Sequence, residues 1–326
     1  MSSERPDPAD SNDPATGPVE AGGRVFLTGG TGFVGSNLRA ALADRPVRLL
    51  VRDAARAERL RGPNVEFVKG DVTRPESLRG AIDGCDAVIH LVGIIEESGP
   101  GAGSFDTVIR QGTENVLAEA QRAGVGHFVH MSALGATDDP DLPYMQAKWR
   151  AEGAVRASAL PWTIVRPSVV FGPGDGFINP LALLVKSPIT PVVGDGQSRF
   201  MPVAIGEVAE IFAATPGRTE RQGQTFELGG GKIYTFEQML DAIGNELGKH
   251  HPRVKVPVPL ISAVVRLSKP LPKALRPPVT TEQLKMLKSN NTTDHSATGT
   301  LLGRPALALE DGLGYLRPGA RNQPPE

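Results

Sequence analysis

A glycine-rich turn near the N-terminus places the strongest constraint on the fold. The run Thr28-Gly-Gly-Thr-Gly-Phe-Val-Gly35 carries glycine at every third position, at Gly29, Gly32 and Gly35. It follows the apolar run Arg24–Thr28 and opens a helical pattern. Glycine is required where a turn brings backbone amides against a pyrophosphate and where a helix packs close to a sheet. Because a helix N-terminus attracts anions, the run predicts a dinucleotide-binding strand–turn–helix.

Apolar runs alternate with helical patterns as far as residue 170. The expected strands are 24–28, 47–51, 65–69, 86–92, 127–131 and 162–166, and the expected helices are 34–43, 75–82, 105–123 and 144–158. Strands that are apolar almost throughout, alternating with helices, are typical of a parallel sheet covered on both faces. We therefore predict an α/β fold, with a doubly wound parallel Rossmann sheet in an NAD(P)-binding domain over 24–170.

The pattern changes after residue 170, where proline and glycine become frequent. We expect a helix near 180–186, an element over 203–214, a strand over 225–228 and a helix from Phe236 whose capping box is Thr235 and Gln238. These elements predict a small mixed α/β lobe over 171–316, interwoven with the sheet, that binds substrate. The ends, 1–23 and 317–326, are polar and rich in proline, so we predict disordered tails.

Composition excludes several classes of protein. The net charge of −1 argues against a polyelectrolyte that binds nucleic acid by neutralising phosphates. A single cysteine, Cys85, excludes an intramolecular disulfide framework and a zinc site of several cysteines, and we predict no metal site. The longest apolar run, 88–95, is too short to span a membrane, and the N-terminus lacks the apolar segment of a secretory signal. We expect a cytoplasmic protein, with peripheral contact at the inner face of a membrane left open.

The end of the second expected strand bears on the choice of coenzyme. NAD binders place a carboxylate there for the ribose 2′-hydroxyl, whereas NADP binders place a cation for the 2′-phosphate. Arg52 takes the first position past the strand, which favours NADP(H). If Arg52 is merely exposed and Asp53 caps the next helix, NAD(H) stays open. Asp71, after the third strand, either accepts a hydrogen bond from the adenine or caps the next helix.

Tyr144 and Lys148 form a candidate catalytic pair. Their spacing of four places both side chains on one face of a helix. A phenol is a poor base at neutral pH, but a nearby ammonium and an oxidised nicotinamide both lower its pKa. Ser132 ends the fifth strand, at the sheet edge where ligands of open α/β sheets bind, and could polarise a substrate carbonyl. A chance Tyr–Lys pair is the competing interpretation.

These motifs occur in a familiar order. With GDV after the third strand, DAVIHLVG in the fourth and Arg166-Pro-Ser-Val-Val-Phe-Gly172, the chain resembles the short-chain dehydrogenase/reductase superfamily over about 24–230. It looks most like the extended or atypical NAD-dependent epimerase/dehydratase branch. The stretches HLVGII, HMSALGA and TTEQLKMLKSNN resemble the group that contains the 39 kDa subunit of respiratory complex I.

The resemblance implies catalytic roles for Ser132, Tyr144 and Lys148. The residues that it implies around the cofactor are Gly29, Thr31, Gly32, Phe33, Val34, Gly35, Arg52, Asp71, Val72, Leu91, Val92, Gly93, Lys148, Pro167, Ser168 and Val169. Arg199 matches a position that often holds a substrate-phosphate arginine in extended relatives. One departure is that Ser132 lies close before Tyr144 and is followed by Ala133, which disfavours a sugar-nucleotide substrate.

The stretch from Lys249 to Lys288 is strongly basic. It holds nine lysines and arginines and one acidic residue, Glu282, around the apolar helix candidate Pro259–Leu267. Basic residues beside an apolar helix suit an anionic membrane surface, a partner subunit or an anionic substrate, and a solvated face is the competing interpretation. For His90, His127 and His130, on expected strands, we predict packing rather than metal binding.

Three functions compete. The first is an NAD(P)-dependent oxidoreductase that transfers hydride between nicotinamide and a small apolar or lipid-like carbonyl or alcohol, with Tyr144 as general acid/base. The second is a non-catalytic NAD(P)H-binding subunit or scaffold, because the nucleotide of the complex I relatives is structural. The third is a sugar-nucleotide epimerase or dehydratase.

Overall fold

The computed structural model covers most of the chain. It describes residues 23–97, 99, 101, 103–268, 290–317, 319 and 320. Residues 1–22 of the expected N-terminal tail, most of the expected C-terminal tail and the basic stretch beyond Ser268 lie outside the described residues. Among the described residues, no helix combines the length and hydropathy needed to cross a bilayer.

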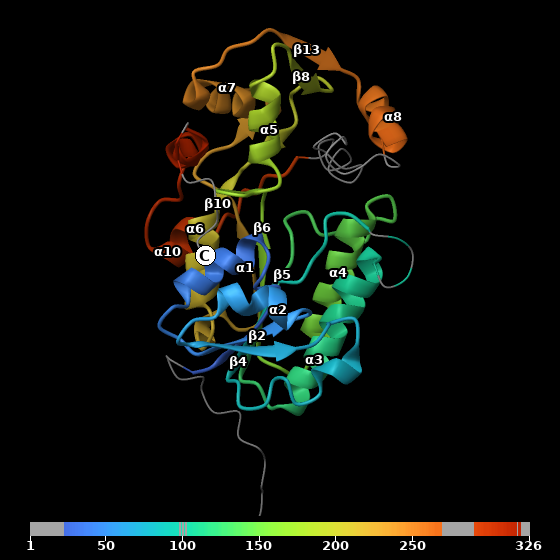
Figure 1. The fold of residues 1–326 in the computed structure, drawn as a ribbon, viewed down its shortest axis with the longest axis vertical. Helices are drawn as coiled ribbons and strands as arrows, with labels where there is room; N and C mark the ends of the chain where they lie inside the picture. The colour runs from blue at the N-terminus through green and yellow to red at the C-terminus, as the bar shows by residue number, and fades with distance from the viewer. Residues whose placement is uncertain are drawn as a thin grey trace, which may run out of the picture.

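A seven-stranded parallel sheet forms the centre of the molecule (Figure 1). Its strand order is β11-β6-β5-β4-β1-β2-β3, and every neighbouring pair is parallel. The strands are β1 (Val25–Thr28), β2 (Val47–Val51), β3 (Val65–Lys69), β4 (Ala87–His90), β5 (His127–Met131), β6 (Trp162–Pro167) and β11 (Gln224–Leu228). The predicted fold class, a parallel Rossmann sheet, is confirmed.

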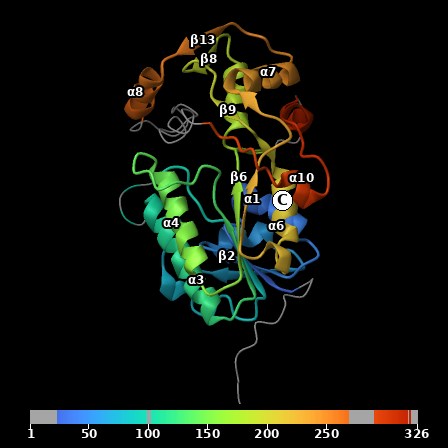
Figure 2. The same cartoon turned by 180° about the vertical axis from the view of Figure 1, so that it is seen from behind.

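Helices cover both faces of this sheet (Figures 1 and 2). One face carries α1 (Phe33–Ala41) and α6 (Ile205–Ala214), and the other carries α3 (Gly112–Arg122) and α4 (Pro143–Ala157). The elements between them are short: α2 (Ala54–Ala57), η1 (Glu58–Leu60), η2 (Pro75–Leu78), η4 (Thr219–Arg221) and α10 (Thr298–Leu302). Burial on both faces explains why the strands are apolar almost throughout.

Two expected helices differ from their predictions, and the one expected over 75–82 is only the short 3-10 helix η2. The pattern over 105–123 predicted a single α-helix, whereas the structure begins with a π-helical segment, η3 (Asp106–Gln111), before α3. A π-helix has one more residue per turn than an α-helix, and over a single turn this does not interrupt the apolar pattern. Hydrophobic periodicity in the sequence therefore does not reveal the π-helical segment. The segment lies against α4, the helix that carries Tyr144 and Lys148.

The chain leaves the sheet after β6 and forms the lobe above it (Figure 1). Its helices are α5 (Ile178–Val185), α7 (Phe236–Leu247), α8 (Val258–Ser268), α11 (Leu309–Gly312) and η6 (Leu313–Leu316). Its short strands pair as β7 (Val170–Phe171) with β10 (Val203–Ala204), β8 (Thr190–Val193) with β13 (Arg253–Val256), and β9 (Arg199–Phe200) with β12 (Tyr234–Thr235). Since α6 and β11 return to the central sheet, lobe and sheet alternate along the chain.

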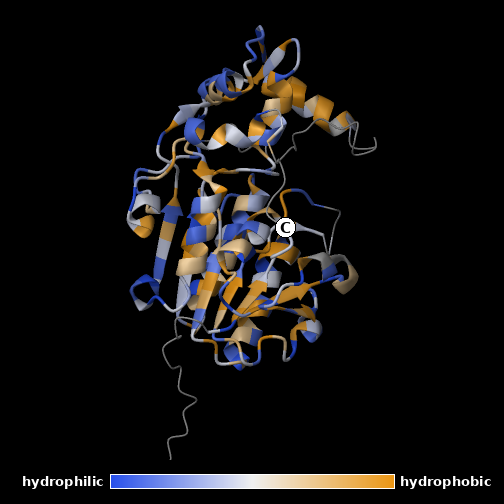
Figure 3. Cartoon of the chain, turned by 60° about the vertical axis from the view of Figure 1, so that its left-hand side comes forward, coloured by the Kyte–Doolittle hydropathy of each residue, from blue (hydrophilic) through white to orange (hydrophobic). Residues whose placement is uncertain are grey.

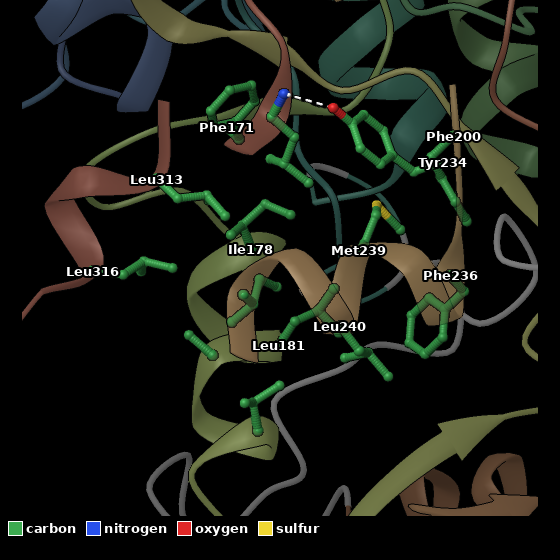
Figure 4. Packing of buried hydrophobic residues seen from close by; sticks show 14 of the residues in the cluster. Phe171, Ile178, Leu181, Phe200, Tyr234, Phe236, Met239, Leu240, Leu313 and Leu316 are labelled. Carbon is green, nitrogen blue, oxygen red and sulfur yellow. Dashed lines mark hydrogen bonds between the residues drawn. The ribbon is translucent and has the colours of Figure 1, made fainter. Parts of the chain in front are cut away.

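The lobe has a hydrophobic core of its own (Figure 4). Helices α5 and α7 pack together there against the C-terminal residues Leu313 and Leu316. The predicted capping box of α7 is present, with both the Thr235 and the Gln238 side chain bonded to backbone. Tyr234 accepts a hydrogen bond from the amide of Leu309 and bonds the carboxylate of Glu310, which fixes the C-terminal helices on this core.

Asp175 fixes the turn that joins β7 to α5. Its carboxylate is 4% exposed and accepts hydrogen bonds from the amides of Gly172 and Phe177, among others, and from the hydroxyl of Tyr315. Asp175→Ala leaves these buried donors unsatisfied, so we expect the free energy of unfolding to fall by about 3 kcal/mol. Urea unfolding measures this, and exposed Asp195→Ala is the control. A loss below about 1 kcal/mol would contradict the role.

Candidate active site

The glycine-rich turn connects β1 to α1 with the geometry that a pyrophosphate requires. Gly29 has φ of +75°, which favours glycine, and the amide of Gly32 donates to the carbonyl of Gly29 at 3.1 Å. A Cβ at Gly35 would overlap the backbone of Gly29 and Gly30. The first turn of α1 has no acidic residue and no side-chain cap, so its amides are open to an anion. The turn therefore fits a dinucleotide, with Thr31 exposed, Val34 half-buried and Phe33 on a cavity wall.

Two of the predicted coenzyme contacts lie at the ends of β2 and β3. Arg52 is exposed directly after β2, and the carboxylate of Asp53 accepts the amide of Ala55 at 3.1 Å, at the start of α2. The carboxylate of Asp71 accepts the amide and the hydroxyl of Thr73, both at 2.9 Å. The carboxylates of Asp53 and Asp71 thus both bond within local turns, but only Asp53 lies at a helix start, since Arg74 is the N-cap of η2. Arg52 and Lys69 are both exposed at this edge of the sheet.

The segment after β4 lies beside the glycine turn and Lys148. A Cβ on Gly29 would come within 3.2 Å of the amide of Val92, and one on Gly93 within 3.3 Å of Lys148 Nζ. Leu91 is buried, and its amide donates to the carbonyl of Thr28 at 3.2 Å. The backbone after β4 therefore lies close enough to the glycine turn for one bound molecule to contact both segments. Val72, also predicted, is buried, and its carbonyl accepts a hydrogen bond from the side-chain amide of Asn115.

A cavity of about 320 Å³ opens where the sheet edge meets the lobe. From the sheet side come residues after β5 and β6, with Phe33 and Tyr144, and from the lobe come Phe177, Phe200 and Asn291. The complete lining is Phe33, Ile95, Met131, Ser132, Ala133, Leu134, Tyr144, Pro167, Ser168, Val169, Val170, Gly176, Phe177, Phe200 and Asn291. Most of these side chains are apolar, so the cavity suits an apolar ligand.

Tyr144 and Lys148 lie on α4 as predicted. The ring of Tyr144 packs edge-on against Phe105, with centroids 5.6 Å apart, and burial raises the pKa of its phenol to about 12. Lys148 is 3% exposed and donates to the carbonyl of Met131 at 2.8 Å. Burial lowers the pKa of this ammonium to about 8, although the nearby charge of Glu152 raises it. Tyr144 is therefore a neutral phenol at pH 7, which donates a proton more readily than it accepts one.

Ser132 has a different orientation from the one its proposed role needs. Its oxygen is shielded from solvent and lies near the carboxylate of Glu152, beneath α4. Ala133, the next residue, also lines the cavity. The structure therefore brings Tyr144 and Lys148 to the site without opening the Ser132 hydroxyl to the cavity.

The other polar groups of the cavity wall are engaged by the protein itself. The hydroxyl of Ser168 donates to the carbonyl of Met201 at 2.6 Å. The amide side chain of Asn291 accepts from the backbone of Val169 at 3.0 Å and donates to the carbonyl of Leu134 at 3.3 Å. No hydrogen bond to the Tyr144 hydroxyl occurs among the described residues, so this group is available to a ligand.

Several residues of the site were not predicted from sequence. Asn291 returns to the cavity from far along the chain and bonds the backbone at Val169 and Leu134; it ends the TTEQLKMLKSNN stretch, but the sequence predicted no role for it. In β9, Phe200 lines the cavity and Arg199 is exposed and absent from the lining. Successive strand residues point to opposite faces, so the alternation that buries Phe200 turns Arg199 outward.

All three strand histidines are buried: His90 and His130 stack on the sheet face covered by α3 and α4, whereas His127 lies on the other face, where its ring accepts the amide of Gly217. His90 bonds the hydroxyls of Thr28 at 2.7 Å and Thr113 at 3.1 Å, and it stacks on His130. Thr113 donates its own proton to the carbonyl of Ile109, so it must accept from Nε2–H of a neutral His90. Burial lowers the pKa of His90 to about 3, helped by the charge of Lys148. His127 likewise packs within the core, bonded to Thr163.

A buried ion-pair network supports the helix that carries the candidate pair. Glu152 of α4 is fully buried and accepts two hydrogen bonds from Arg166 of β6, at 2.7 and 2.8 Å, and one from Arg156. Burial raises the pKa of the Glu152 carboxyl, but the hydrogen bonds from Arg166 and Arg156, the nearby hydroxyl of Ser132 and the charge of Arg166 together outweigh burial and hold this pKa below the usual range. Arg166 also pairs with Glu227 of β11. The network therefore fixes α4 against the sheet edge at which the cavity opens.

Comparison with known proteins adds an independent finding. A family model described as NAD(P)H-binding matches residues 29–175. The complex I subunit "NADH dehydrogenase [ubiquinone] 1 alpha subcomplex subunit 9" of Arabidopsis thaliana is 28% identical over 293 residues, covering 87% of this chain and 72% of that protein. A ceramide reductase of Caulobacter vibrioides is 34% identical over 205 residues, 61% of this chain and 63% of the reductase.

Other relatives match over similar or smaller parts. A 3 beta-hydroxysteroid dehydrogenase/isomerase of Mycobacterium tuberculosis is 34% identical over 54% of this chain and 55% of its own. The matches thus span less than two thirds of the bacterial reductase and dehydrogenase. Among solved structures, an NADPH-dependent quinone oxidoreductase of Escherichia coli, complexed with NADPH, superposes with a TM-score of 0.71 at 19% identity, over 90% of this chain and 99% of that one. At this identity the likeness is one of fold.

The glycine turn, the parallel sheet and the matched family model agree with one another. The turn supplies the open helix N-terminus and the close backbone approach that a dinucleotide needs. The family model begins at Gly29 and runs past the last cavity residue of β6. The glycine turn and the parallel sheet thus agree with the NAD(P)H-binding family model that matches residues 29–175, and together they support a nicotinamide dinucleotide as the cofactor.

Proposed function

We propose that the protein is an NAD(P)-dependent oxidoreductase that reduces a small apolar or lipid-like carbonyl compound, or oxidises the matching alcohol. One observation carries this proposal: the hydroxyl of Tyr144 is free in a cavity whose other walls are mainly apolar. Relatives named as a ceramide reductase and a steroid dehydrogenase support the same class of reaction.

In the proposed mechanism, the residues of α4 handle the proton. The bound nicotinamide supplies hydride to the carbonyl carbon or removes it from the alcohol. Tyr144 donates its phenolic proton to the carbonyl oxygen as the C=O bond becomes C–OH, and then regains a proton from solvent. Since burial raises the pKa of Tyr144 to about 12, the neutral donor form is present at pH 7.

Lys148 has a positioning role in this mechanism. One of its N–H groups is held by the carbonyl of Met131, and its other donors are available to a ribose hydroxyl of the coenzyme. The same cavity is lined by Pro167, Ser168 and Val169, which would lie against the nicotinamide. With the Ser132 oxygen shielded, polarisation of the carbonyl falls to Tyr144 alone.

The apolar wall also bears on the substrate. Phe177, Phe200 and Val170 face the space that a substrate would occupy beyond the nicotinamide. Sugar hydroxyls placed there would lose their water without gaining partners, which costs free energy for each group. The cavity therefore favours an apolar carbonyl over the sugar nucleotide of an epimerase.

Arg52 provides the test of coenzyme preference. We propose that NADP(H) is preferred, because the exposed guanidinium after β2 suits a 2′-phosphate. Arg52→Glu should lower the ratio of NADPH to NADH affinity by about tenfold or more, because it replaces attraction with repulsion. Fluorescence titration of both coenzymes measures the ratio, with exposed Arg79→Glu as control. If the ratio stays unchanged in Arg52→Glu, this residue does not select NADP(H).

A second candidate function is a nucleotide-binding subunit without turnover. The complex I subunit relative and the shielded Ser132 oxygen favour it. Such a protein would contact a partner subunit and would bind NADPH with normal affinity. It would not oxidise NADPH against a panel of apolar aldehydes, ketones and quinones, whereas the reductase would.

A further inference from the structure

Helix α8 exposes an apolar stripe at the edge of the lobe. Leu260, Val264 and Leu267 are 57%, 50% and 78% exposed, and their spacing of four and then three places them on one face. The adjacent face is also apolar, since Val265 and Ile261 pack into the lobe core. A helix of a soluble lobe ordinarily turns polar residues outward, so this outer stripe is a candidate contact surface.

The stripe lies in a part of the lobe that projects from the molecule. In Figures 1 and 2, α8 stands at the end of the lobe on the same side as α4, and Figure 3 shows it as mainly hydrophobic. Val254 of β13, just before α8, is 50% exposed, and Ile189, beside the paired strand β8, is 56% exposed. The exposed apolar residues therefore continue along the chain from α8 onto its neighbouring strands.

Charge indicates what this stripe contacts. The sequence has no acidic residue from 247 to 281, whereas Lys249, Arg253 and Lys255 precede α8 and are exposed. Arg253 and Lys255 pair with Asp241 and Glu237 of α7, which neutralises part of this charge. Further basic residues, beginning with Lys269, follow α8 in the sequence. An exposed apolar helix face flanked by cations matches the interface of an anionic bilayer.

We propose that α8 docks the protein on an anionic lipid surface, with Leu260, Val264 and Leu267 inserted among the lipids. The core that holds α8 also contains Phe200 and packs against Phe177, both of the cavity wall. A surface-bound molecule would thus hold its cavity near the bilayer, where an apolar substrate is most concentrated. The docking does not require Tyr144 to be catalytic.

Vesicle binding by the full chain tests the proposal. Without coenzyme or substrate, vesicles of phosphatidylcholine mixed with phosphatidylglycerol should bind about tenfold or more tightly than phosphatidylcholine alone, and salt should weaken the binding. The double variant Leu260→Gln with Leu267→Gln should lose about tenfold or more of this affinity. Trp149→Gln, which removes an exposed apolar side chain from α4, should bind like the wild type.

Three outcomes would overturn the proposal. The first is equal sedimentation of wild type and double variant with anionic vesicles. The second is a dimer that the double variant converts to monomer, because a second copy would then cover the stripe. The third is a lower unfolding temperature for the double variant, because the stripe would then pack within the chain. Turnover measured in parallel reports on Tyr144, so failure of docking and failure of the reductase are distinguishable.

Discussion

Tyr144→Phe should reduce the turnover of an apolar carbonyl substrate by about a hundred- to ten-thousandfold. The phenylalanine ring keeps the contact with Phe105 and removes only the proton donor. Coenzyme affinity should stay within about twofold, because this hydroxyl acts on the transition state rather than on coenzyme binding. Stopped-flow oxidation of NADPH, with fluorescence titration of the coenzyme, separates the two quantities.

A matched tyrosine serves as the control. Tyr234→Phe removes a hydroxyl that bonds the amide of Leu309 within the lobe core, away from the cavity. It should lower the free energy of unfolding by about 1 kcal/mol and leave turnover unchanged. Normal turnover by Tyr144→Phe would refute the role of the phenol as proton donor, and NADPH binding without turnover by the wild type would favour the scaffold function.

Gly35→Ala is expected to have the second large effect. Its methyl group would overlap the carbonyl oxygen of Gly29 and the Cα of Gly30, and neither backbone atom can rotate away as a side chain can. The turn must open, which we expect to cost about 1–3 kcal/mol of stability and about tenfold or more in affinity for NADPH and NADH alike. Calorimetric titration and thermal unfolding measure the two losses.

Gly153→Ala is the control for that substitution. Gly153 lies in α4, and a Cβ there meets no atom within 4 Å. Alanine should therefore stabilise the helix by about 0.5–1 kcal/mol and leave coenzyme affinity unchanged. If Gly35→Ala bound NADPH as tightly as Gly153→Ala, the dinucleotide would not lie against the turn between β1 and α1.

Much of the sheet was predictable because its signals are local. Strands β2, β3 and β5 have the predicted bounds, since each is rich in apolar or β-branched residues and is followed by polar or turn residues. The start of α7 followed from its capping box. By contrast, β7, β9 and β12 have two residues each and pair with distant partners, so they leave no period in the sequence.

The site was predictable in part. Spacing on a helix correctly placed Tyr144 and Lys148 on α4, because helical geometry is fixed by residue number. Ser132 lies just past the end of β5, where the alternation of the strand no longer determines which way a side chain points. Asn291 and Phe200 reach the cavity through returns of the chain, which only the tertiary structure reveals.

The bonds made by Asn291 limit how this protein can be re-engineered. Its side chain joins the segments after β5 and β6, while its backbone bonds Arg199 and Met201 of the lobe. A chimaera in which only residues 171–268 were replaced by those of a relative would take the lobe side of the cavity wall from that relative. It would not take the relative's residue at the position of Asn291, which joins the two sides of the wall. Because the cavity wall is built from several separate stretches of chain, it cannot be transplanted as one segment.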